Sequence, residues 1–172
     1  MNELENPVAL GITVTLDPTE QLICKAIAKK RYQNARSMNV KNSKIGDQSN
    51  EQTDLEGVSS ELAFCKMFNV YPDLTVQVRS SIDGTDQGDA VLRDGRTVDV
   101  KSTKYFTGRL LAVRWKKQNV DLFALMIGTF PTYTFKGFMK SEELLKEERI
   151  GSLGHGNGYI AQQHELKDLE NI

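Results

Sequence analysis

The sequence has little cysteine, no long apolar run and almost no net charge. Its two cysteines, Cys24 and Cys65, fall at apolar positions of predicted helices, which excludes a disulfide scaffold or a cysteine cluster and predicts reduced core residues. No apolar run approaches the roughly 20 residues that span a bilayer. The N-terminus carries Glu3 and Glu5, where a signal peptide would be basic. We therefore expect a cytoplasmic chain that makes no contact with a membrane.

The net charge of −1 is not that of a strongly cationic nucleic-acid binder, but the charges are segregated along the chain. Residues 93–117 hold eight Lys and Arg against two Asp, and residues 19–44 hold seven basic residues against one acid. Acids gather in residues 142–148 and in the C-terminal tail. The basic segments could contact phosphates, because such contacts supply most non-specific affinity for nucleic acid. The alternative is that they are solvated surface.

The order of predicted elements indicates a mixed α/β fold. With 39% hydrophobic residues in 172, the chain can bury one core, so we expect a single domain. Asp17 and Pro18 open a helix that runs to about Met38, and residues 39–52 are polar and predict a mobile loop. A capping box of Thr53 and Glu56 predicts the next helix start. Strands are expected near residues 74–79, 110–115 and 120–127, with a short helix from residue 141.

Residues 88–101 form the most informative stretch, because they predict a β-hairpin with Asp94-Gly95 in its turn. A three-residue loop of residues 94–96 pairs Ala90 with Val100 and gathers the apolar side chains on one face. Since strand side chains alternate, the other face then carries three charged residues: Asp89, Asp99 and Lys101. A two-residue loop would put Asp89 on the apolar face, so we favour the longer loop. A bulge beside Asp89 would give the same faces.

Two carboxylates that converge on one point repel each other, and a cation between them removes that repulsion. Hard oxygen ligands of this kind suit Mg²⁺ or Mn²⁺. Lys101, two residues past Asp99, could hold a phosphate oxygen or an attacking water and stabilise charge that develops in a transition state. The alternative is an exposed hairpin with a surface salt bridge.

A third acid, Glu61, lies upstream on the second predicted helix. It shares an apolar stripe with Phe64 and Phe68 at helical spacing. Burying an unpaired carboxylate costs several kcal/mol, so Glu61 needs a partner. That partner is either a basic side chain or a metal ion shared with Asp89 and Asp99.

These motifs resemble those of the PD-(D/E)xK nuclease superfamily, which includes many restriction enzymes, phage nucleases and junction resolvases. Glu61 in Gly57-Val-Ser-Ser-Glu61 is similar to the family's first-helix glutamate, Asp89 to the aspartate of its first motif, and Asp99-Val-Lys101 to its acid-x-lysine motif. Gly88 stands where the family's name has proline, at a position that varies widely. No Gln-x-x-x-Tyr follows Lys101, which disfavours the exonuclease and recombination branch. Residues 134–138 and 159–166 are similar to later strands of the family, and the resemblance covers roughly residues 19–170.

The resemblance implies a restriction-endonuclease-like α/β fold, with a mixed central β-sheet flanked by α-helices. It implies a Mg²⁺-dependent DNA nuclease, with Mn²⁺ as a substitute, that acts as an endonuclease in the cytoplasm of a bacterium or a phage-infected host. Glu61, Asp89 and Asp99, with the Val100 carbonyl, would bind metal, and Lys101 would complete the catalytic set. Cutting both strands of a duplex would favour a homodimer.

The principal alternative is a catalytically inactive DNA- or protein-binding module on the same fold, such as a phage regulator or inhibitor. Cleavage of RNA by the same acids is a third interpretation.

Two further features carry weaker signals. Residues 151–158 are rich in glycine but lack the Gly-Lys-Ser/Thr ending of a phosphate-binding loop, so we expect a flexible loop. Tyr105, Phe106 and Trp115 lie in the basic segment and could stack on bases. Packing in the core is the more ordinary fate of Trp115.

Overall fold

The computed structural model describes residues 10–39, 49–76, 88–154 and 156–172, which form a mixed α/β fold with two sheets. The five strands of the central sheet are β1 (Thr13–Thr15), β2 (Ala90–Val91), β3 (Thr97–Thr103), β5 (Leu122–Thr129) and β6 (Thr132–Lys140). Their order is β1-β6-β5-β3-β2, in which β3 and β5 are parallel and the other pairs are antiparallel. This confirms the predicted α/β class.

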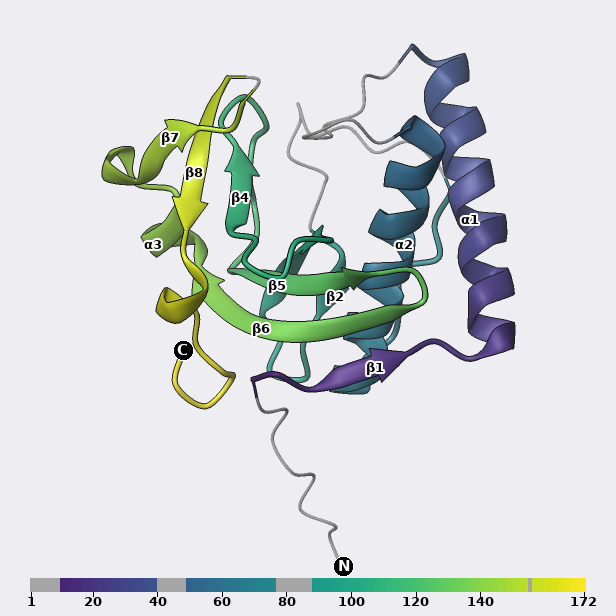
Figure 1. The fold of residues 1–172 in the computed structure, drawn as a ribbon, viewed down its shortest axis with the longest axis horizontal. Coiled ribbons are helices and arrows are strands. Elements are labelled where there is room, and N and C mark those ends of the chain that lie inside the picture. The colour runs from purple at the N-terminus through teal and green to yellow at the C-terminus, as the bar shows by residue number, and fades with distance from the viewer. Residues whose placement is uncertain (1–9, 40–48, 77–87, 155) are drawn as a thin grey trace, which may run out of the picture.

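A second sheet of three strands and the helices complete the fold (Figure 1). The strands of this second sheet are β4 (Leu110–Val113), β7 (Ile150–Ser152) and β8 (Asn157–Ala161), in the order β4-β8-β7. The helices are α1 (Pro18–Ser37), α2 (Asn50–Phe68) and the short α3 (Ser141–Leu144). Short 3-10 turns cover Glu147–Arg149 and Gln163–Glu165. Within the described ranges, no helix combines the length and apolar character needed to cross a bilayer.

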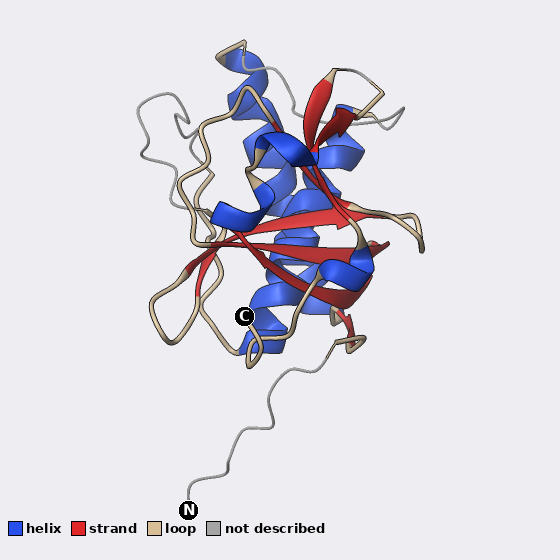
Figure 2. Ribbon diagram, turned by 90° about the vertical axis from the view of Figure 1, so that its left-hand side faces the viewer, coloured by secondary structure: helices blue, strands red, loops and turns tan. Residues whose placement is uncertain are grey.

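The central sheet has a different cover on each face (Figure 2). On one face lies α2, with α1 packed against it, and the core between them includes a cluster of four phenylalanine rings with centroids 4.5 to 6.3 Å apart: Phe64, Phe68, Phe135 and Phe138. On the other face, Phe123 and Leu125 of β5 pack with Leu110 of the second sheet and Leu144 of α3. Because β5 is covered on both faces, its sequence is a continuous apolar run. The long helices therefore flank the sheet on one face only.

Of the two predicted helix starts, that of α1 is confirmed and that of α2 is wrong. Asp17 caps α1 and forms a capping box with Glu20. The capping box predicted at Thr53 and Glu56 is wrong, because α2 begins at Asn50 and the Ser49 hydroxyl accepts a hydrogen bond from the Gln52 N–H over 3.1 Å. The predicted loop of residues 39–52 is therefore too long at its C-terminal end, and residues 40–48 lie outside the described residues.

Glu56 has a tertiary role in place of the predicted cap. Its carboxylate accepts hydrogen bonds from the Phe130 N–H at 3.0 Å and from the Tyr133 hydroxyl. These contacts tie the turn between β5 and β6 to α2. Because Ser49 caps α2, the Glu56 carboxylate is not the capping group of this helix and instead binds residues of the sheet.

Two predicted segments differ from the structure. Residues 74–76 form no strand, and residues 77–79 lie outside the described residues. The loop predicted at residues 151–158 is a β-hairpin in its described part, because Gly151 pairs with Gly158 across β7 and β8. A Cβ atom on Gly158 would lie 2.6 Å from the Ala112 carbonyl oxygen, so glycine permits the close approach of β4.

Candidate functional site

The predicted hairpin is present with a shifted register. Ala90 pairs with Val98 rather than with Val100, and the three-residue loop consists of residues 93–95 rather than 94–96. Gly95, with φ of 89°, ends this loop, which is where a three-residue hairpin needs a left-handed residue. The predicted and observed registers differ by two positions, so the faces are unchanged. Asp99 and Lys101 thus lie on the face opposite to Val98 and Val100.

Asp89 is held against β3 by its backbone and by its side chain. Its N–H donates to the Val98 carbonyl at 2.8 Å, and its Oδ2 accepts from the Val100 N–H at 2.7 Å. The preceding Gly88 has φ of 88°, and a Cβ atom there would lie 2.6 Å from the Val98 oxygen. Only glycine fits this approach, which places Asp89 beside the strand that carries Asp99.

The Val100 carbonyl, predicted as a metal ligand, points to the same edge of β3 as the one on which Asp89 lies. Along a strand, the N–H and C=O of one residue point to the same neighbour. Since the Val100 N–H binds Asp89, its carbonyl points toward the edge on which Asp89 lies. The structure therefore brings together the acids of both hairpin arms and this carbonyl.

Asp99 and Lys101 form a short ion pair in a largely buried position. The Lys101 Nζ lies 2.5 Å from the Asp99 Oδ1, and Asp99 is 6% exposed. That Oδ1 is buried, and the Lys101 ammonium lies against it. The Lys101 side chain is 30% exposed and therefore reaches solvent.

Glu61 has a basic partner, one of the two that its apolar position predicted. The Arg31 Nη1 lies 3.1 Å from the Glu61 Oε2. The same guanidinium donates to the carbonyls of Asp73 at 2.9 Å and Thr75 at 2.8 Å. Arg31 thus joins α1, α2 and the segment after α2. Sequence reasoning missed Arg31, and the signal that points to it is the unpaired acid on α2, which requires a cation on a neighbouring element.

The four predicted residues form one electrostatic group. Burial raises the pKa of Glu61, although Arg31 opposes the shift. Burial, with the charges of Glu61 and Asp99, raises the pKa of Asp89 well above its usual range. Burial lowers the pKa of Lys101, but Asp99, Asp89 and Glu61 together outweigh it and raise that pKa. Three acids therefore act on one lysine, which stays protonated.

The acids are in electrostatic range but do not converge as a preformed metal site. In the part of the chain that the structure describes, no three His, Cys, Asp or Glu side chains lie close enough together to hold a metal ion. Asp99 contacts Lys101, Glu61 contacts Arg31, and Asp89 contacts the Val100 N–H. Asp89, Asp99 and Lys101 thus lie on the hairpin, and Glu61 of α2 is paired with Arg31.

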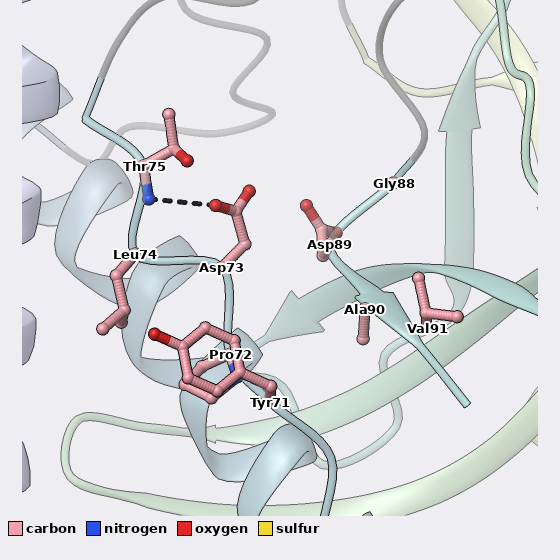
Figure 3. A pocket seen from close by; sticks show the side chains of 9 residues that line it. All are labelled: Tyr71, Pro72, Asp73, Leu74, Thr75, Gly88, Asp89, Ala90 and Val91. Carbon is pink, nitrogen blue, oxygen red and sulfur yellow. Dashed lines mark hydrogen bonds between the residues drawn. The ribbon is translucent and has the colours of Figure 1, made fainter. Parts of the chain in front are cut away.

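A pocket of about 570 Å³ opens beside this group (Figure 3). It is lined by residues 71–75 and 88–91. In Figure 3 the carboxylates of Asp73 and Asp89 point into the space between these segments, and Asp73 accepts a hydrogen bond from the Thr75 N–H at 2.9 Å. Asp89 is the predicted site residue that lines this pocket; Glu61, Asp99 and Lys101 do not.

The two cysteines and Trp115 give contrasting outcomes. Cys24 and Cys65 are buried and free, as predicted, and burial raises the pKa of the thiols to about 11 and about 12, so both stay protonated. Trp115 is 67% exposed, so the core position expected for it is wrong.

Fold and site together define a mixed α/β protein with an acid–lysine cluster on a hairpin at the edge of its central sheet. The chain belongs to a family of unknown function, DUF5843, whose model matches residues 6–166. A comparison with curated proteins finds no match.

Proposed function

We propose that this protein is a metal-dependent DNA nuclease of the PD-(D/E)xK kind that hydrolyses phosphodiester bonds as an endonuclease. The observation that carries the proposal is the grouping of Asp89, Asp99 and Lys101. Asp99 and Lys101 project from the same face of β3, and Asp89 is hydrogen-bonded to that strand from the other arm of the hairpin. Acids beside a lysine are what phosphodiester hydrolysis requires, whereas binding of DNA alone would be opposed by them.

The residues fit a divalent cation such as Mg²⁺ or Mn²⁺. The Asp99 Oδ1 is buried against the Lys101 ammonium at 2.5 Å, and the raised pKa of Asp89 arises in part from neighbouring carboxylates. A cation between Asp89 and Asp99 would remove that repulsion, and the Asp99 carboxylate would become its ligand once Lys101 turns away. Asp89 and Asp99 with the Val100 carbonyl would hold it, and Glu61 would join them on release from Arg31. When bound, such an ion acidifies water and polarises the phosphate.

Lys101 supplies positive charge where the phosphate would react. Its raised pKa keeps the ammonium charged at neutral pH, and its partly exposed side chain can turn from Asp99 toward a phosphate oxygen. There it would orient the attacking water and stabilise the charge that develops on phosphorus. The family resemblance implies a 5′-phosphate and a 3′-hydroxyl as products.

The segregated basic residues support nucleic acid as the substrate. Lys104 and Arg109 follow the site strand and are exposed. They would contact phosphates on either side of the reacting bond. Two copies of the chain would bring two sites to a duplex, so a homodimer belongs to the proposal.

One observation favours a second candidate, an inactive DNA- or protein-binding module. Each candidate acid already has a partner, and within the described segments no three acids gather at metal-binding distance. A protein that had lost catalysis would keep such internal pairs as structural links. Cleavage of RNA by the same residues is a third outcome of the experiment below.

The test is cleavage of supercoiled plasmid, end-labelled linear duplex and labelled RNA in Mg²⁺, in Mn²⁺ and in EDTA. We expect metal-dependent nicking of the plasmid, abolished by EDTA. Asp99→Ala should lose both cleavage and Mg²⁺ binding measured by calorimetry. Asp94→Ala is the matched control, since Asp94 pairs with Arg96 in the exposed hairpin loop.

Nicking of plasmid indicates an endonuclease, and shortening of linear duplex alone indicates an exonuclease. Cleavage of RNA alone would replace DNA as the substrate. If none of the three substrates is cut in either metal, the nuclease proposal is wrong and the inactive module takes its place.

A further inference from the structure

Two aromatic side chains are displayed on the loop between β3 and β4. Phe106 is 78% exposed and Tyr105 is 64% exposed. Aromatic rings normally bury much of their area, so neighbouring exposed rings indicate a binding surface. The loop follows directly after the strand that carries Asp99 and Lys101. Tyr105 thus stands four residues past Lys101 in the chain.

The backbone of this loop is tied down at several points. The side-chain amide of Gln163 donates to the carbonyls of Phe106 and Gly108, each at 2.8 Å. The Gly108 N–H donates to the Tyr105 carbonyl at 2.8 Å. A Cβ atom on Gly108 would lie 2.3 Å from the Thr103 Cγ2, so the loop packs closely against the end of β3. Rings held on a fixed backbone lose little conformational entropy when they bind a ligand.

Positive charge surrounds the two rings. The Lys104 Nζ lies 5.3 Å from the Tyr105 ring centroid, and the Lys136 Nζ lies 5.0 Å from that of Phe106. Arg109 is exposed at the end of the loop, and residues 102–110 contain no acid. Each ammonium lies over one face of its ring, so an exposed ring of this kind matches a nucleotide that stacks a base on the other face while the cation contacts the phosphate.

We infer that residues 104–109, with Lys136, form a stacking platform for an unpaired base of a nucleic acid strand. This inference rests on the proposed function and specifies its substrate class, which is nucleic acid with a single-stranded segment such as a frayed end, flap or branch. At about 3.3 Å per residue, Tyr105 lies within about 13 Å of Lys101 along the chain. A strand seated on the platform would therefore pass close to the candidate site.

The test measures binding of the full chain in EDTA by fluorescence anisotropy, so that cleavage does not enter. The probes are a single-stranded DNA oligonucleotide, an abasic oligonucleotide of the same length, and a fully paired duplex. Phe106→Ala should weaken binding of the base-containing strand by at least about fivefold, and leave binding of the abasic strand unchanged. Phe106→Tyr, which keeps the ring, should bind like the wild type. Trp115→Ala is the matched control, because Trp115 is another exposed aromatic residue in the basic segment.

Several results would overturn the platform. They are unchanged binding by Phe106→Ala, an equal loss on the abasic strand, an equal loss in Trp115→Ala, tighter binding of the paired duplex than of the single strand, or no binding of any probe by the wild type. Plasmid cleavage tests the proposed function separately. Cleavage without ring-dependent binding would remove the platform and leave the nuclease.

Discussion

The buried carboxylate of Asp89 lowers the free energy of unfolding at neutral pH. Burial and the neighbouring acids raise its pKa in the folded state above the ordinary value of 3.8. Between 3.8 and the raised value, the folded protein binds more protons than the unfolded chain. The free energy of unfolding therefore falls as pH rises through this window, and the loss persists at neutral pH.

Asp89→Asn should consequently stabilise the metal-free protein at pH 7. An amide oxygen can still accept the Val100 N–H, while the negative charge is gone. We expect a rise of about 2–4 °C in Tm, which corresponds to roughly 1 kcal/mol for a chain of this length. Calorimetric Tm values for both proteins between pH 4 and pH 7 check this. The difference should vanish at the acid end, and addition of Mg²⁺ should stabilise only the wild type.

A Tm difference that is absent at pH 7, or that is the same at every pH, would show that Asp89 carries no electrostatic penalty.

Arg31 provides a second prediction at this scale. Arg31→Met leaves Glu61 without its cation and frees two backbone carbonyls. Because the pair is partly exposed, we expect a loss of about 1–3 kcal/mol in the free energy of unfolding by urea, less than for a fully buried pair. The double variant Arg31→Met with Glu61→Gln should recover part of it.

Lys66→Met is the matched control, since it breaks the more exposed Lys66–Glu20 pair at 2.8 Å. It should cost less than about 1 kcal/mol. Equal losses in Arg31→Met and Lys66→Met would contradict the anchoring role of Arg31.

The placement of Asp99 and Lys101 on one face of a strand could be predicted from sequence, but the partner of Glu61 could not. Alternation along a strand suffices to put Asp99 and Lys101 on one face. The sequence also predicted that Glu61 has a partner, because an acid on an apolar helix stripe requires one. Arg31 and Glu61 are 30 residues apart in sequence and meet because α1 packs on α2, a contact that no local pattern encodes.

At the scale of the element, glycine geometry positions the site hairpin. Gly88 and Gly95 have nearly equal φ values, 88° and 89°, but different surroundings. Gly88→Ala would force a Cβ atom to within 2.6 Å of the Val98 oxygen, whereas a Cβ atom on Gly95 meets nothing within 4 Å. Gly88→Ala should thus displace Asp89 and abolish metal-dependent cleavage.

Gly95→Ala should keep cleavage and lose only about 1 kcal/mol of stability, from backbone strain. Urea unfolding and plasmid nicking on both variants check the pair. Full cleavage by Gly88→Ala would contradict the proposed positioning of Asp89.

Elements were predictable where one local signal dominated. The start of α1 follows from Asp17, Pro18 and Glu20, which all agree. The start of α2 could not be predicted in this way, because Ser49 and Thr53 both qualify as caps. Glu56, the expected partner of Thr53, binds the sheet instead. The hairpin loop had the predicted length and kept the predicted faces, but the position of Gly95 at its end set the actual register.

At the scale of the whole molecule, segregated charge should allow DNA binding despite a net charge of −1. Arg109→Glu should weaken binding of single-stranded DNA several-fold at low salt, with a smaller loss at high salt because counterions screen the contact. Lys146→Glu is the control, since Lys146 is exposed within the acidic segment of residues 142–148. Anisotropy titrations at two salt concentrations check both. Equal losses in the two variants would mean that overall charge, not its location, governs binding.

The central claim is that Asp89, Asp99 and Lys101 cut phosphodiester bonds, and one comparison tests it most directly. Nicking of supercoiled plasmid in Mg²⁺ is measured for the wild type, Lys101→Ala and Lys146→Ala, with Mg²⁺ binding and folding checked for each. We predict that Lys101→Ala folds and binds Mg²⁺ but loses at least about 100-fold in nicking rate, while Lys146→Ala, at an exposed lysine of the acidic segment, stays within a few-fold of the wild type. Nicking by Lys101→Ala at the wild-type rate would contradict the account.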